Sequence, residues 1–233
     1  MTVKTIRPFD PRWTGEYSLE AETLRIALAP LPVIIDHIGS TAVDGLVAKP
    51  LVDILVQITD LKSIDDQRTR LEDMGYDARG EYGVVGRRYF SKAVNAGIVT
   101  GFHVHIFEKD SYQARRHIAF RDCLRVRPDL ARTYANLKRS IADRDGQLPA
   151  DYAGRKASYV DLIADVAVLQ SDPTGVYKSI APYMNPDSET DRLDVAYHEK
   201  WVQALQKEAL LPGDRAQASD HYCFARSCTH FCK

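Results

Sequence analysis

Short runs of apolar residues separated by polar ones mark the first half of the chain. Apolar runs over residues 33–38 and 51–58 predict two buried strands. Alternating apolar and polar residues over 86–92 and 101–107 predict two further strands, and the turn at residues 95–97 joins them as a hairpin. These strands predict a β-sheet.

Apolar residues also recur at helical spacing, between the strands and after them. The predicted helices cover residues 14–29, 60–75, 111–127, 128–141, 152–169 and 191–211. This order predicts an α/β or α+β fold, a β-sheet flanked by helices. A segment with several Pro and Ser residues over 171–189 predicts a boundary, so we expect a main domain over residues 1–170. Residues 171–233 then form a linker, a helical extension and a tail.

Composition narrows the class of protein. The 31 Lys and Arg residues balance 32 acidic residues, so no strong field favours nucleic acid or a membrane surface as partner. The first residues lack the apolar core of a signal peptide, and no run reaches the length of a membrane span. We therefore expect a soluble cytoplasmic protein whose partner is a small molecule rather than nucleic acid.

Cysteine usage indicates no disulfide framework. Cys123 lies alone in a predicted helix, and the other three cysteines lie near the end of the chain with two histidines. The tail from His221 to Cys232 offers soft metal ligands, but their spacing matches no zinc module. A loosely ordered tail is the alternative.

The turn at Gly39, Ser40 and Thr41 is the first candidate for chemistry. It follows a predicted strand, so its backbone N–H groups and two hydroxyls can hold phosphate oxygens. The alternative is an ordinary turn with a capping hydroxyl. Asp53 is the second candidate, because a carboxylate in an apolar strand is costly unless it is paired, hydrogen-bonded or bound to a cation. Asp53 is therefore a candidate metal ligand.

Two histidines and two arginines lie on the hairpin strands. His103 and His105 share one face, where both can ligate one ion or one can act on protons. Ordinary sheet histidines, hydrogen-bonded to neighbours, are the alternative. Arg87 and Arg88 point to opposite faces, so one can reach a phosphate or carboxylate at the site. The alternative is that their charge protects an edge strand.

Several separated motifs resemble the GrpB family, a branch of the nucleotidyltransferase superfamily. The segment from His37 to Val56 carries the resemblance most strongly. It extends to residues 10–13 (Asp-Pro-Arg-Trp), 120–125 (Phe-Arg-Asp-Cys-Leu-Arg) and 134–138 (Tyr-Ala-Asn-Leu-Lys). The resemblance covers roughly residues 6–168 and implies an α+β fold, a nucleotidyltransferase-like mixed β-sheet flanked by helices, to which the chain adds a C-terminal helical extension.

The resemblance also implies a metal site and catalytic residues. GrpB proteins carry a His-x-His strand where His103 and His105 stand, so these imidazoles with Asp53 are implied as a mixed oxygen–nitrogen site for a divalent ion. Such ligands suit Zn²⁺ or Mn²⁺ better than Mg²⁺. Lys49 completes the candidate catalytic set. The superfamily carries a second acidic residue two positions after the first, and Leu55 departs from that pattern.

The same resemblance implies a nucleotide substrate. The candidate nucleotide-binding residues are Gly39, Ser40, Thr41, Arg87, Arg88 and Lys138. The implied activity is the metal-dependent transfer of a nucleotidyl or related group from a nucleoside triphosphate to a small-molecule acceptor. Two alternatives stay open: a catalytically degenerate nucleotide- or metabolite-binding protein, and a transferase repurposed for coenzyme or small-molecule metabolism. The helix over residues 191–211 could dock on the main domain, cover the active-site mouth or mediate a homodimer.

Overall fold

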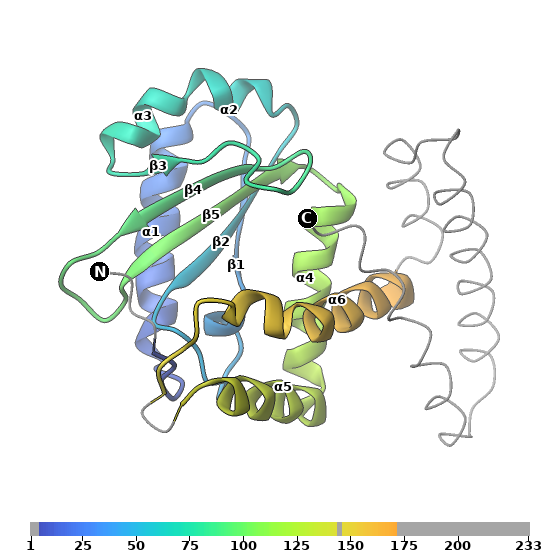
Figure 1. Cartoon of the computed structure of the whole chain (residues 1–233). Helices are drawn as coiled ribbons and strands as arrows, with labels where there is room; N and C mark the ends of the chain where they lie inside the picture. Colours follow the sequence, from blue (N-terminus) through green and yellow to red (C-terminus); the bar gives the residue numbers. More distant parts are fainter. Residues whose placement is uncertain (1–4, 144–145, 172–233) are drawn as a thin grey trace.

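Five strands form one mixed sheet in the computed structural model, which describes residues 5–143 and 146–171 (Figure 1). The strands are β1 (Ile34–Ile38), β2 (Val52–Ile58), β3 (Asp77–Ala78), β4 (Arg88–Ala93) and β5 (Gly101–Glu108). They lie in the order β1-β2-β5-β4-β3; β2 and β5 run parallel, and the other neighbours are antiparallel. The predicted fold class is confirmed. The sequence did not predict β3, which is too short to show a pattern.

Six helices and a 3₁₀ turn accompany the sheet in this described part. They are α1 (Arg12–Leu28), η1 (Ser40–Ala42), α2 (Lys62–Asp66), α3 (Arg68–Asp73), α4 (Tyr112–Val126), α5 (Pro128–Ile141) and α6 (Tyr152–Ser171). The single helix predicted over residues 60–75 is wrong, because the backbone leaves helical geometry at Gln67. This break lets Ile64 of α2 and Leu71 of α3 both bury against the sheet.

Some predictions lie outside the described residues. These are the linker after Ser171, the helix over residues 191–211 and metal binding by the tail. Within the described residues, every helix is too short or too polar to cross a membrane.

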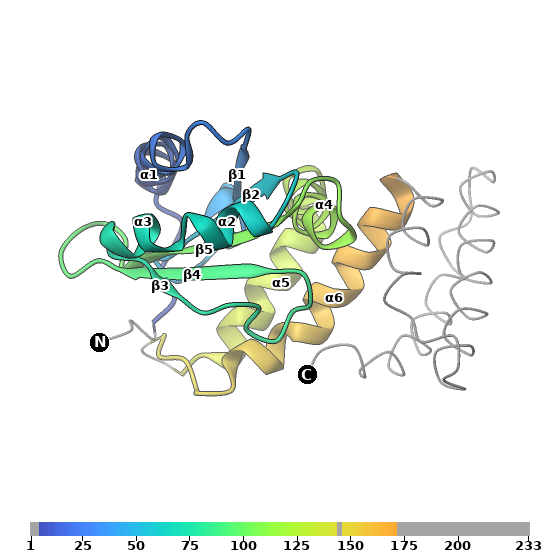
Figure 2. The same ribbon diagram turned by 90° about the horizontal axis from the view of Figure 1, so that it is seen from above.

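One face of the sheet, the apolar face, packs beneath α1, α2 and α3 (Figure 2). Its residues on β2 and β5 are Val52, Ile54, Val56, Ile58, Phe102, Val104 and Ile106. All of them are buried, and alternation along each strand aims them at the helices. Trp13 of α1 is buried in the same core.

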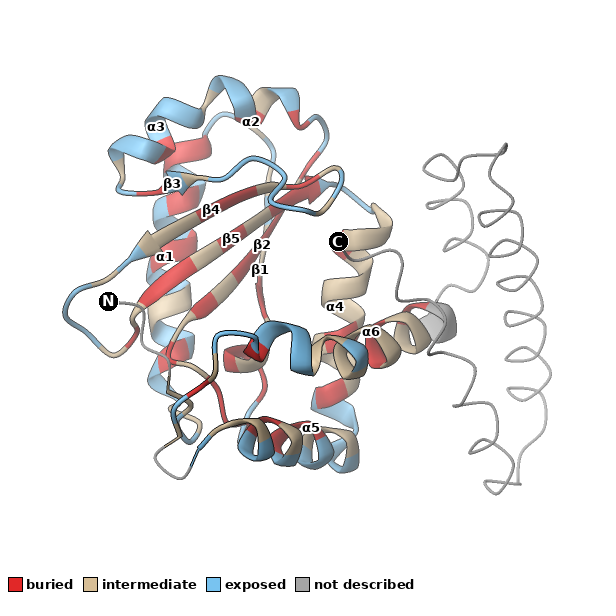
Figure 3. Cartoon of the chain, viewed as in Figure 1, coloured by how far each residue is buried: buried red, intermediate tan, exposed pale blue. Residues whose placement is uncertain are grey.

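The opposite face, the polar face, carries the candidate site. Its residues are Asp36 and Ile38 of β1, Asp53, Leu55 and Gln57 of β2, His103, His105 and Phe107 of β5, and Tyr89 and Ser91 of β4. Part of it lies under α4, where Leu55 and Phe107 form an apolar cluster with Ala114. α5 and α6 pack with α4 on this side of the sheet (Figure 2). Figure 3 shows buried residues along the strands and an exposed loop between β3 and β4.

Candidate functional site

Asp53, His103 and His105 meet on the polar face. In the register of β2 and β5, Asp53 lies beside His103, and His105 follows two residues further along. His103 Nδ1 lies 3.4 Å from Asp53 Oδ1, and His105 Nε2 lies 3.7 Å from the same oxygen. The side chains of Asp53 and His103 are 29% and 33% exposed. The structure thus brings the acid and both imidazoles together where a ligand can reach them.

The two imidazoles keep Asp53 ionised. Burial alone would raise the pKa of Asp53, but the ring nitrogens of His103 and His105, which face Oδ1 at 3.4 and 3.7 Å, outweigh burial and hold this pKa well below its usual range. An ionised carboxylate only accepts hydrogen bonds, so the facing nitrogen of each ring carries a proton. Asp53 is therefore a fixed negative charge at neutral pH.

Arg87 fixes the same tautomer of His105 from the other side of the ring. Its NH1 lies 3.5 Å from His105 Nδ1, and a guanidinium can only donate. The proton of the neutral ring therefore sits on Nε2, which faces Asp53. This Nε2 is buried and has no hydrogen-bond partner among the described residues. Burial also lowers the pKa of His105, so the ring is neutral.

Gly39 brings the predicted phosphate turn directly against Asp53. Its φ of 71° lies in the left-handed region that favours glycine. A Cβ at this position would lie 2.5 Å from Asp53 Oδ2, so a side chain here would collide with the carboxylate. The preceding residue, Ile38, is the register partner of Asp53. The pairing of β1 with β2 thus places the turn beside the acid.

The two hydroxyls of the turn differ in their surroundings. Ser40 is partly exposed, and its Oγ accepts a hydrogen bond from Lys138 Nζ at 2.9 Å. Thr41 is 1% exposed, and its hydroxyl lies 2.9 Å from His37 Nε2. Ser40 is therefore the hydroxyl that a ligand can reach, while Thr41 supports the turn from inside.

Lys138 supports the same turn from beneath. It is 1% exposed, it donates to Ser40 and to the Val47 carbonyl, and its Nζ lies 4.3 Å from the centroid of the Tyr134 ring. Burial lowers the pKa of Lys138, and nearby positive charges act in the same direction. Lys138, predicted as a nucleotide-binding residue, is thus a buried residue that positions Ser40.

Two of the predicted basic residues, Arg88 and Lys49, contact the helices α2 and α6. Arg88 points to the apolar side of β4 and forms a bidentate ion pair with Asp65 of α2, at 2.6 and 2.8 Å. Arg88 therefore lies on the opposite side of β4 from Asp53, because neighbouring strand residues point to opposite faces and Arg87 takes the side of His105. Lys49 lies against α6, with Nζ 4.8 Å from the centroid of the Tyr152 ring.

Leu55 stands where the nucleotidyltransferase pattern would place a second acid. It is 0% exposed and packs with Phe107 and Ala114 beneath α4. An acid here would be buried among apolar side chains. The packing beneath α4 therefore favours an apolar residue at position 55. Asp53 is the acidic residue that β2 places on the polar face.

The model of the family described as GrpB protein matches residues 4–165. The chain belongs to the GrpB family. It is 34% identical over 134 residues to UPF0157 protein YqkA of Bacillus subtilis, a match that spans 58% of this chain but 38% of YqkA. The crystal structure of GrpB from Enterococcus faecalis covers 71% of this chain and 98% of its own, with a TM-score of 0.64 and 34% identity. A remote structural likeness, with a TM-score of 0.39 and 12% identity, extends to the Cid1 poly(U) polymerase bound to MgGTP.

Two further rings lie beside the histidines of this GrpB-family site. Tyr89 lies with its ring centroid 5.4 Å from that of His103 and 5.2 Å from that of His105. His117 of α4 lies 5.3 Å from His105. The sequence could have indicated Tyr89, because it follows Arg87 by two residues and so points to the same face of the strand. No local signal indicated His117, because only the packing of α4 on the sheet brings it there.

The site fits a divalent ion through Asp53 rather than through three protein ligands. Among the described residues, no three His, Cys, Asp or Glu side chains are arranged to hold a metal ion. His105 Nε2 would have to lose its proton to bind one, and Arg87 opposes moving that proton to Nδ1. Asp53 is ionised and accessible, and Mg²⁺ or Mn²⁺ can complete such a site with phosphate oxygens and water.

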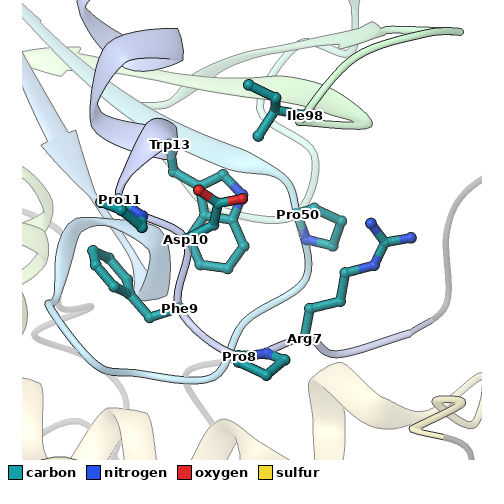
Figure 4. Close-up of a pocket in the computed structure, with 8 residues that line it drawn as sticks. All are labelled: Arg7, Pro8, Phe9, Asp10, Pro11, Trp13, Pro50 and Ile98. Atoms are coloured by element: carbon teal, nitrogen blue, oxygen red, sulfur yellow. The ribbon is translucent and has the colours of Figure 1, made fainter.

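A cavity of about 320 Å³ lies apart from these residues, at the N-terminal arm (Figure 4). Its lining residues are Arg7, Pro8, Phe9, Asp10, Pro11, Trp13, Pro50 and Ile98. The Asp10 carboxylate pairs with Arg12 at 2.7 Å. None of the predicted site residues lines this cavity, so it does not define the site on the polar face.

Proposed function

We propose that the chain is a nucleotidyltransferase-like enzyme that binds a nucleoside triphosphate on the polar face and transfers a nucleotidyl or related group to a small-molecule acceptor. One observation carries the proposal: Gly39 approaches Asp53 so closely that a Cβ would lie 2.5 Å from Oδ2. A phosphate bound by the turn would therefore lie beside an ionised carboxylate.

The turn offers uncharged donors for phosphate oxygens. The 3₁₀ turn uses the N–H groups of Ala42 and Val43 for its own bonds, to the carbonyls of Gly39 and Ser40. The N–H groups of Ser40 and Thr41 come before these and are not used by the turn. With the Ser40 hydroxyl, they can bind an anion that also faces Asp53.

Asp53 would hold a divalent ion together with phosphate oxygens, and this ion would neutralise the charge that develops on them. The N–H groups of His103 and His105 that face Oδ1 orient the carboxylate. His105 is buried and fixed by Arg87, so it acts by positioning. His103 is the more exposed of the two and is the one that can reach an acceptor.

Transfer would form one bond and break one. An acceptor hydroxyl attacks the α-phosphorus, a new P–O bond forms, and the α–β phosphoanhydride bond breaks. Pyrophosphate leaves with the electron pair of that bond. His103 Nε2 takes the proton of the acceptor, because Nδ1 of this ring is engaged by Asp53.

A binding protein without turnover is the second candidate. Leu55 favours it, because β2 carries no second acidic residue beside Asp53 to hold another ion, and Asp36 of β1 is paired with Arg121. The two candidates agree on where the triphosphate binds and differ on whether it is consumed.

The test measures ATP binding by calorimetry and pyrophosphate release, both with Mn²⁺ and with Mg²⁺. We expect Asp53→Asn to abolish release, and Gly39→Ala to weaken binding because its Cβ displaces Asp53. Arg88→Ala is the matched control, because Arg88 points away from the site. Binding without release by the unmodified protein would favour the second candidate, and absence of binding would reject both.

A further inference from the structure

Tyr82 holds an exposed aromatic ring at the edge of the polar face. It lies in the loop between β3 and β4, is 63% exposed, and stacks on Tyr89 at 5.2 Å with 16° between the rings. Tyr89 is buried and contacts the rings of His103 and His105. A series of rings therefore leads from solvent to the histidines beside Asp53.

The loop that carries Tyr82 is fastened to the polar face. Arg87 donates from Nε to the Glu81 carbonyl at 3.0 Å and from NH2 to the Tyr82 carbonyl at 2.6 Å. Val84 packs against the apolar cluster beneath α4. Figures 1 and 2 place the loop on the same side of the sheet as α5 and α6. The loop that carries the exposed ring is thus held at the edge of the polar face by a buried arginine and by the apolar contact of Val84.

The backbone of Tyr82 adopts a strained conformation. Its φ of 46° lies in the left-handed region, which residues other than glycine seldom adopt. The surrounding bonds sustain this conformation while the ring stays exposed. A ring fixed in this way loses little freedom when a planar ligand stacks on it.

We propose that Tyr82 is the stacking platform for the base of the bound nucleotide, with Tyr89 supporting it from below. This inference rests on the proposed function and extends it to the base. The π-face of Tyr82 would accept a purine or a pyrimidine with little discrimination. With the base on Tyr82, the phosphates extend past Tyr89 toward the Gly39–Thr41 turn and Asp53.

The experiment compares two probes on the full chain, ATP and inorganic tripolyphosphate, by calorimetry with Mn²⁺ present. Tyr82→Ala should weaken ATP binding about 10-fold and leave tripolyphosphate binding unchanged, because only the stacking contact is lost. Tyr82→Trp should retain ATP affinity and show quenched fluorescence on binding. Val85→Ala is the matched control, because Val85 is 66% exposed in the same loop and carries no ring.

The outcomes separate this inference from the proposed function. Unchanged ATP affinity in Tyr82→Ala, or equal weakening of both probes, would overturn stacking and leave the triphosphate site standing. Stacking would also be overturned if the unmodified protein bound ATP no more tightly than tripolyphosphate. If it binds neither probe, the proposed function fails and the stacking inference fails with it.

Discussion

The two faces of strands β2 and β5 differ in polarity and in exposure to solvent. On the apolar face, Ile54 and Val104 are 0% and 1% exposed beneath helices. On the polar face, their chain neighbours Asp53 and His103 keep 29% and 33% of their side chains exposed. Adjacent residues thus divide two tasks, because a strand sends successive side chains to opposite faces. The apolar face supplies most of the burial free energy, and the polar face carries the ionised carboxylate.

Leu55 is an exception to this division between the faces, and we expect its replacement to have the largest effect on stability. It lies on the polar face but is buried beneath α4. We expect Leu55→Asp to lower the free energy of unfolding by about 5 kcal/mol, because it removes packed apolar atoms and buries an acid without a partner. Urea unfolding measures this loss, and Leu55→Met should cost less than about 1.5 kcal/mol. A stable Leu55→Asp protein with faster turnover would show that the position tolerates a second acid.

A matched pair of neighbours tests the division directly. Ile54→Ala should lower the free energy of unfolding by about 3.5 kcal/mol, because it leaves a cavity beneath the helices. ATP affinity should stay unchanged at temperatures where the variant is folded. Asp53→Asn should abolish pyrophosphate release, with a smaller loss of stability in urea than Ile54→Ala. Equal losses of stability in both variants would contradict the separation of the two faces.

His37 makes stability depend on pH. Burial lowers the pKa of His37 to about 4; Asp53 opposes this shift, and Arg125 and Arg121 add to it. The unfolded chain therefore binds a proton at higher pH than the folded chain, and stability is lost as pH falls from about 6.5 to about 4. We expect this residue to account for about 3 kcal/mol between pH 7 and pH 4.

Urea unfolding across this pH range, compared with His37→Gln, measures the effect. The substituted protein should lose less stability on acidification, since its side chain takes up no proton. Parallel profiles for the two proteins would show that His37 is not the group responsible. If the stabilities of the two proteins instead diverged as pH rose above 7, the pH dependence would have the opposite sign to the one expected for His37.

The two adjacent arginines should give the smallest effect on stability. Arg88→Ala removes a partly exposed ion pair with Asp65, so we expect a loss of about 0.5 kcal/mol and unchanged ATP affinity. Arg87→Ala should weaken ATP binding, because the Tyr82 loop and His105 both lose a partner. Calorimetry on both variants checks the contrast. A larger loss of affinity in Arg88→Ala would place the nucleotide on the other side of β4.

Much of the site could be predicted because it rests on strand alternation and a family resemblance. His103 and His105 share a face by spacing alone, and the same rule sends Arg87 and Arg88 apart. The rule could not say which arginine would meet the histidines, because that depends on which face α4 leaves open. It also could not predict Lys138, whose cation is buried under the turn through packing of α5 against Ser40.

The hydrophobic pattern of the chain was enough to predict β1, β2, β4 and β5, the helices of the described residues apart from the break at Gln67, and which side chains share a face. These properties depend on neighbours a few residues apart, so periodicity reveals them. Only the tertiary structure decided that Gly39 touches Asp53, that Leu55 is covered, and that the Tyr82 loop reaches the site. Each of these depends on contacts between segments far apart in the chain, which local spacing does not encode.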